Sequence, residues 1–93
     1  MTKRVEQINE LVKRELSQII LREFASPENT LITIMNVDTA LNFQSAKIQI
    51  SVIPESRADA VMKDLNQEIY SIQQTLNKRL KIRPVPKIIF LKM

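Results

Sequence analysis

Apolar side chains recur at helical spacing in the first quarter of the chain. They fall mostly three or four residues apart and form one stripe, made of Val5, Ile8, Leu11, Val12, Leu16, Ile19, Ile20 and Phe24. A stripe of this period, with polar residues between its members, is typical of an amphipathic helix. Because the residue before a proline disfavours the helical conformation, the pattern predicts a helix over 5–24 that ends before Pro27.

The middle of the chain has the shorter period of β-strands. Ser45–Val52 alternates cleanly between apolar and polar residues, which predicts a strand with one buried face and one wet face. Leu31–Val37 is also rich in strand-forming residues, but both of its alternating sets are largely apolar, so the pattern leaves its inward face open. The polar residues 38–44 predict a connection, and the two runs predict an antiparallel hairpin.

A second helical stripe follows Pro54, and its members are Val61, Leu65, Ile69, Ile72, Leu76 and Leu80. Ser56, with an acid three residues later, predicts the N-cap of this helix. The helix must stop by Arg83, because Pro84 follows it. A sharp kink needs a proline, a glycine or a bulge, and the chain contains no glycine, so we expect this helix to be more continuous than in related proteins.

Lys87–Leu91 predicts a third strand, so the order of elements is α-β-β-α-β. This order predicts one α+β domain over residues 1–93, with two helices packed on one face of a three-stranded mixed sheet. We expect the second stripe to face the side of the sheet that carries Ile48 and Ile50. Without glycine, turns that need positive φ must use asparagine or aspartate, and the candidates are Asn29, Asn36, Asn42 and Asn77.

The net charge of +4 is concentrated near the C-terminus. Residues 77–93 contain six cations and no acid, whereas residues 1–76 sum to −2. The six are Lys78, Arg79, Lys81, Arg83, Lys87 and Lys92. Two interpretations are open: a surface that binds the phosphates of a nucleic acid, or a solvated helix end whose cations complement the helix dipole. If the surface binds phosphate, we expect Arg83→Ala to weaken binding more than Lys92→Ala.

The aromatic residues favour phosphate contact over base stacking. The chain has only three Phe and one Tyr, and no two of them cluster on a strand as a stacking surface requires. Phe43 lies in the predicted connection and is a candidate contact residue, whereas Phe24 and Phe90 fit the core.

The composition provides few residues for catalysis, metal binding or a membrane span. The chain has no cysteine and no histidine, so it lacks a thiol nucleophile, the commonest general base and the commonest ligands of transition metals. Without glycine it has no phosphate-binding loop. We therefore expect no catalysis, no cofactor and no metal. No apolar run approaches the roughly 20 residues of a membrane span. The charged N-terminal sequence is unlike a signal peptide, so we expect a cytoplasmic protein with no membrane partner.

Three segments, in order, are similar to the motifs of one known family. The first is the opening helix Arg4–Leu16, and the second is Ala46–Val52, AKIQISV, where the family has a similar Ala-Lys-Val-x-Val-Ser-Val. The third is Leu76–Phe90, which is similar to the family's basic helix end, its Leu-Arg-x-x-Pro turn and its apolar strand with Phe. With these segments the chain resembles the ribosome-binding factor A family. It departs from the family at 68–70, where the family usually carries Ala-x-Gly at a helix kink.

The resemblance implies a KH-like fold of type II and a binding factor that acts without catalysis in maturation of the 30S small ribosomal subunit and in 16S rRNA processing. Its expected partners are the free, immature 30S subunit and 16S rRNA, with release before translation, and we expect a monomer in solution. The RNA-binding residues that we expect are Lys78, Arg79, Lys81, Arg83, Lys87 and Lys47. Two alternatives stay open: a KH-like RNA-binding module with another role, and a protein-interaction module with a basic edge.

Overall fold

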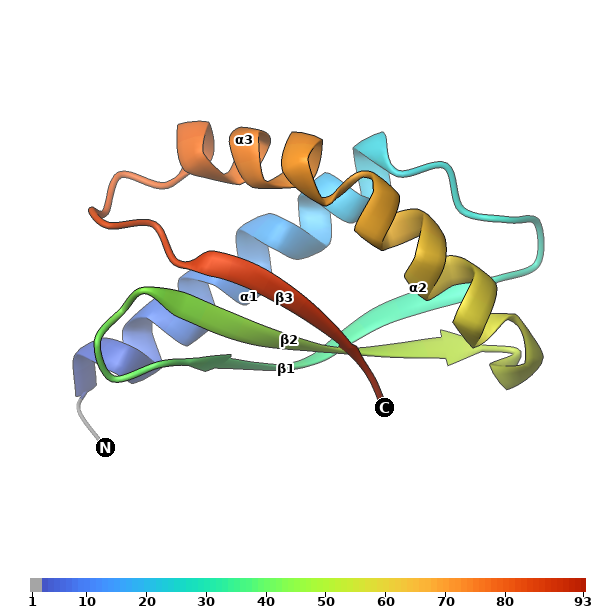
Figure 1. Ribbon diagram of the computed structural model, residues 1–93, viewed down its shortest axis with the longest axis horizontal. Helices are drawn as coiled ribbons and strands as arrows, with labels where there is room; N and C mark the ends of the chain where they lie inside the picture. Colours follow the sequence, from blue (N-terminus) through green and yellow to red (C-terminus); the bar gives the residue numbers. More distant parts are fainter. Residues whose placement is uncertain (1–2) are drawn as a thin grey trace.

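The computed structural model describes residues 3–93. Its elements are, in order, α1 (Lys3–Glu23), β1 (Leu31–Thr39), β2 (Ser45–Ile53), the 3₁₀ turn η1 (Glu55–Arg57), α2 (Ala58–Gln67), α3 (Ile69–Arg79) and β3 (Lys87–Lys92). β1 pairs antiparallel with β2, and β2 pairs parallel with β3, so the strand order is β1-β2-β3 (Figure 1). The predicted α+β class, the hairpin and the mixed sheet are confirmed.

The helices cover only one face of the sheet, and the core lies between the two layers (Figure 1). Along β2 the residues from Ala46 to Val52 alternate between buried and more exposed positions, as the sequence predicts. Ile48 and Ile50 belong to the same buried cluster as Leu65 and Leu76. Burying a side chain of this size contributes about 1.5–3 kcal/mol, so apolar contact between the layers dominates the stability.

The inward face of β1 is decided by a bulge. The pairing of β1 with β2 shifts by one residue between Ile34 and Asn36. Ile34 is buried before the shift and Val37 after it, whereas Met35 and Asn36 are both exposed. One extra residue in a strand exchanges the two faces, because side chains alternate with a period of two. A single alternating pattern therefore could not describe the whole strand.

The expectation of one continuous second helix is wrong. α2 ends at Gln67, α3 begins at Ile69, and Glu68 between them has φ −102° and ψ 6°, outside the helical region. Figure 1 shows the ribbon changing direction here. α2 packs on β2 and β3, whereas α3 packs on α1 and β3. One straight helix could not follow both surfaces, so their burial accounts for a break without glycine or proline.

The predicted N-cap at Ser56 is also wrong. The chain enters α2 through η1, in which the Arg57 N–H donates to the Pro54 carbonyl oxygen at 3.0 Å. The Ala58 N–H then donates to the Glu55 carbonyl oxygen, and no side chain caps α2. A 3₁₀ turn is a common helix start because its own hydrogen bonds satisfy part of the backbone there.

Within residues 3–93, two residues other than glycine have a positive φ. Asn29 has φ 56°, which confirms one of the four predicted asparagines. Phe43 has φ 63°, whereas Asn36, Asn42 and Asn77 are not among the positive-φ residues. An aromatic residue is uncommon in this region because its Cβ is crowded by the backbone, so tertiary contacts must hold Phe43 there.

We expect Leu76→Ala to lower the free energy of unfolding by about 2–5 kcal/mol, because Leu76 is fully buried and its removal leaves a cavity. Chemical denaturation measures the change. Gln74→Ala, on the exposed side of the same helix, is the matched control and should stay within about 0.5 kcal/mol of wild type. Equal effects of the two substitutions would contradict the packing of α3 described here.

Candidate nucleic-acid interface

The return from α3 to β3 carries two of the six C-terminal cations, Lys81 and Arg83. α3 ends at Arg79, and Leu80 already has an extended backbone with φ −89° and ψ 136°. Leu80 is buried and Ile82 is partly buried against the core, whereas Lys81 between them is exposed. The apolar residues thus point inward and Lys81 faces solvent.

The side chain of Gln73 fixes this return to α3. Its amide nitrogen donates to the Pro86 carbonyl oxygen at 3.1 Å and to the Asn77 side-chain oxygen at 3.0 Å. Its amide oxygen accepts the Ile88 N–H at 2.9 Å. The backbone on both sides of Lys87 is thereby tied to one half-buried side chain. Each of these hydrogen bonds is worth about 0.5–1.5 kcal/mol net.

Arg83 has a capping role as well as an exposed charge. One guanidinium nitrogen donates to the carbonyl oxygens of Leu80, at 3.1 Å, and Ile82, at 2.7 Å. Carbonyls just beyond a helix lack helical partners, and a basic side chain can satisfy them. The peptide bond between Arg83 and Pro84 is cis. The helix-end interpretation thus describes part of what Arg83 does, while its side chain stays exposed.

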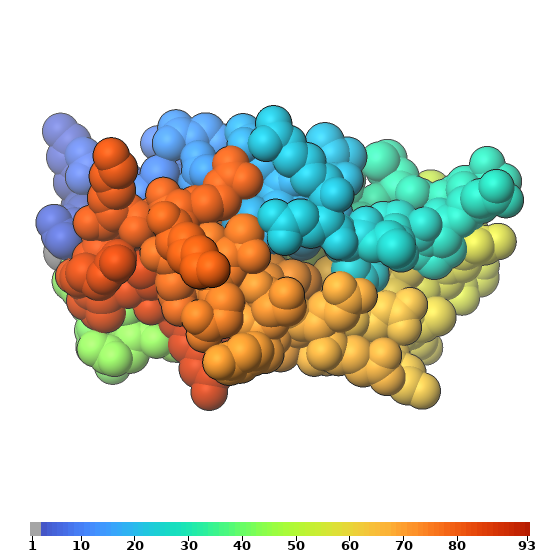
Figure 2. Space-filling model, turned by 90° about the horizontal axis from the view of Figure 1, so that it is seen from above, coloured from blue at the N-terminus to red at the C-terminus, as the bar shows by residue number. Residues whose placement is uncertain are grey.

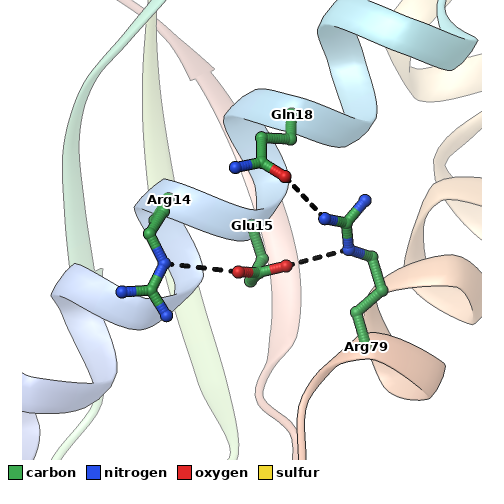
Figure 3. A network of polar contacts seen from close by, with 4 residues as sticks. All are labelled: Arg14, Glu15, Gln18 and Arg79. Carbon is green, nitrogen blue, oxygen red and sulfur yellow. Dashed lines mark hydrogen bonds and ion pairs between the residues drawn. The ribbon is translucent and has the colours of Figure 1, made fainter.

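Arg79 is paired with an acid of another helix (Figure 3). Its Nε lies 2.8 Å from Glu15 Oε1, and its Nη2 donates to Gln18 Oε1 at 2.7 Å, so it joins α3 to α1. The Nε of Arg14 lies 3.3 Å from the other carboxylate oxygen of Glu15, Oε2. The hydrogen bond from Arg79 is the main reason that the pKa of Glu15 lies below its ordinary value. Arg79 therefore has a structural partner that the sequence pattern did not show.

Lys92 is also paired, in another part of the molecule. Its Nζ lies 2.7 Å from Asp59 Oδ1, which connects β3 to the first turn of α2. The hydrogen bond with Asp59 raises the pKa of Lys92. Both side chains are largely exposed, so the pair adds little to stability. Lys92 thus lies apart from the cations at the end of α3.

The remaining predicted cations gather at one end of the molecule. In Figures 1 and 2 the end of α3, the return, the start of β3 and the β1–β2 loop lie at the same end as the first turn of α1. We call this the basic end and define it by six exposed cations, Arg4, Lys47, Lys78, Lys81, Arg83 and Lys87. The first turn of α1 also carries Lys3 and the acid Glu6, both exposed. Asp38 lies opposite Lys47 in the strand register and offsets part of its charge.

Sequence reasoning missed Arg4 as a member of this set. Its guanidinium carbon lies 5.7 Å from the centre of the Phe43 ring, within the range of a cation–π contact. Phe43 is half-buried and packs against the core. Only the fold brings Arg4, 39 residues earlier in the chain, to this loop, so no local signal could have identified it.

A groove in the surface lies away from the basic end. A groove of about 550 Å³ runs between α1 and β1, and no residue of the basic end lines it. Its lining has one cation, Lys13, and no carboxylate. Within residues 3–93, no three acidic, cysteine or histidine side chains gather as a metal would need. No helix in the same range has the length and hydropathy to cross a bilayer.

Comparison with known proteins gives one consistent family. The model of the family described as ribosome-binding factor A matches residues 4–92. A ribosome-binding factor A from Pseudomonas paraeruginosa is 33% identical over 90 residues, which cover 94% of this chain and 70% of that protein.

Two structures extend the comparison to the fold. The crystal structure of ribosome-binding factor A from Thermus thermophilus superposes with a TM-score of 0.81 at 17% identity, over 95% of this chain and 94% of that one. A homology model of the Thermus thermophilus factor, fitted into a cryo-electron microscopy map of a 30S–RbfA complex, gives a TM-score of 0.71 at 20% identity. It covers 89% of this chain and 88% of its own.

The pairing of Glu15 with Arg79 predicts a pH dependence of stability. The folded state lowers the pKa of Glu15, so the pair stabilises the fold above the unfolded pKa of about 4.3 and loses that effect as the pH falls through the folded value. We expect Glu15→Gln to be less stable than wild type at about pH 6, with a difference that shrinks below about pH 4.

Unfolding curves of Glu15→Gln and wild type across this pH range test the prediction. Glu10→Gln removes an exposed carboxylate from the same helix and is the control. If Glu10→Gln showed the same pH-dependent difference, the effect would belong to overall charge and not to the contact with Arg79.

Proposed function

The chain belongs to the ribosome-binding factor A family, and we propose that it binds the immature 30S ribosomal subunit, contacts 16S rRNA while the subunit matures, and leaves before translation. Family membership is the observation that carries this proposal. The fitted Thermus thermophilus factor supports it, because a protein of the same fold was fitted into density from a 30S complex.

We propose that the basic end binds rRNA phosphates. Its six cations are exposed and come from three separate parts of the chain. The return that carries Lys81 and Arg83 is fixed by Gln73, so these charges need little ordering when they bind. Arg79 was expected to join this surface, but its ion pair with Glu15 favours a structural role. Cations that neutralise phosphates release counterions, so this binding should weaken steeply with salt.

The proposed factor acts without catalysis, as a monomer in the cytoplasm. A KH-like RNA-binding module with another role would bind RNA but would not cosediment with the small subunit. A protein-interaction module would cosediment with an acidic protein partner. Cosedimentation with 30S subunits before and after ribonuclease treatment separates these functions, because only the proposed one requires both the subunit and its intact RNA.

We expect the double substitution Lys81→Glu with Lys87→Glu to weaken binding to 30S subunits about tenfold or more, because it reverses two charges of the basic end. The slope of log affinity against log salt should also fall by about one unit for each phosphate that the variant no longer neutralises. Association at several salt concentrations measures both quantities.

The matched control is Lys13→Glu with Lys63→Glu, which makes the same charge change at exposed positions outside the basic end. It should reduce the affinity much less and leave the slope nearly unchanged. Circular dichroism and thermal unfolding establish that both double variants are folded. Unchanged affinity and slope in the basic-end variant would overturn the proposed surface.

A further inference from the structure

The loop between β1 and β2 displays an apolar side chain at the basic end. Leu41 is 70% exposed, although leucine is among the residue types most often buried. It lies in the turn that joins Thr39 to Ser45. A single exposed leucine is common on protein surfaces, so its meaning depends on how the loop is held and on what surrounds it.

The loop is held by a set of hydrogen bonds. The Ala40 N–H donates to the Ser45 carbonyl oxygen at 2.8 Å, and the Phe43 N–H donates to the Ala40 carbonyl oxygen at 2.8 Å. The Gln44 N–H donates to the Asn42 side-chain oxygen at 3.0 Å. Leu41 therefore sits in a closed turn, and binding through it would cost little loop ordering.

Phe43 connects this turn to the core. Its φ of 63° lies in a region that an aromatic residue adopts only when its surroundings determine it. The ring packs against the core, and Arg4 lies 5.7 Å from its centre. The strained residue thus connects the loop that displays Leu41 to a cation of α1.

Cations flank the loop on two sides. Arg4 contacts Phe43, while the Lys87 N–H donates to the Gln44 carbonyl oxygen at 3.0 Å. Lys47 follows on β2, and its side chain is on the same exposed face as that of Lys87. Cations can bind the phosphates of a nucleic acid, and an apolar side chain between them can pack against a base.

We propose that Leu41 packs against the face of an unstacked base in a loop, bulge or helix end of 16S rRNA, while the flanking cations bind the adjacent phosphates. The inference rests on the proposed function and deepens it, because it adds an apolar contact to a charged surface. RNA is favoured over a protein partner because the flanking charges are positive. Single-stranded and irregular RNA offers base faces that a regular duplex does not.

Leu41→Ser tests the contact. We expect it to weaken binding to 30S subunits roughly tenfold, because burying a leucine side chain has about this effect on an equilibrium. The salt slope should stay unchanged, since every cation that neutralises a phosphate stays in place. Binding to protein-free 16S rRNA should fall by a similar factor. The control is Leu21→Ser, which removes a leucine that is 83% exposed on α1 and should leave binding unchanged.

The outcomes separate this inference from the proposed function. Unchanged affinity of Leu41→Ser, together with weakened binding of Lys81→Glu with Lys87→Glu, would overturn the base contact and leave the basic surface in place. Loss of affinity for subunits but not for protein-free rRNA would assign Leu41 to a ribosomal protein and also overturn it. Loss of the salt slope in Leu41→Ser would mean that the loop had collapsed, which contradicts a contact made by Leu41 alone.

A fluorescence measurement gives a second, direct test. The chain contains no tryptophan, so Leu41→Trp introduces a unique reporter at the loop. Base stacking should quench or shift its emission when 16S rRNA or the 30S subunit is added. Tyr70→Trp, at a 74% exposed position of α3, is the control and should not respond. An unresponsive Leu41→Trp that still binds would overturn the inference.

Discussion

The amide of Gln73 is the contact on which the basic end depends. Pro86 has no backbone N–H, so the segment before β3 has fewer ways to pair with its neighbours. The Gln73 side chain donates a hydrogen bond to the Pro86 carbonyl oxygen and accepts one from the Ile88 N–H. With this segment fixed on α3, Leu80 can be buried while Lys81 faces solvent. One neutral side chain thereby sets the position of several charged ones.

Folding also sorts the charges that lie together in the sequence. Arg79 and Lys92 pair with Glu15 on α1 and Asp59 on α2, and so do not belong to the basic end. Arg4 joins the basic end from the start of the chain. The result is a basic end that overlaps with the basic segment of the sequence without being identical to it. The electrostatic potential at a surface depends on the spatial arrangement of the charges. The fold, and not the sequence of residues 77–93 alone, therefore determines which surface attracts an anion.

The sequence predicted the elements whose burial follows one regular period. The first helix and β2 are of this kind, and their predicted buried faces are confirmed. For β3 only the strand itself was predicted, and it is confirmed. The inward face of β1 could not be predicted, because a bulge exchanges its two faces at Met35. The break at Glu68 was missed because two separate surfaces cause it. Arg79 meets Glu15 across 64 positions of sequence, a separation at which local pattern carries no information.

The break at Glu68 also bears on where RNA can bind. The chain keeps a bend between α2 and α3 although it lacks the Ala-x-Gly that the family usually carries there, so backbone shape alone does not require that motif. The residue at the bend is an exposed acid, and Asp64 lies one turn before it. Carboxylates repel phosphate, and an uncompensated charge near a polyanion is unfavourable. These charges therefore favour the basic end, where Lys81, Arg83 and Lys87 lie, over the bend as the place of the proposed contact with rRNA.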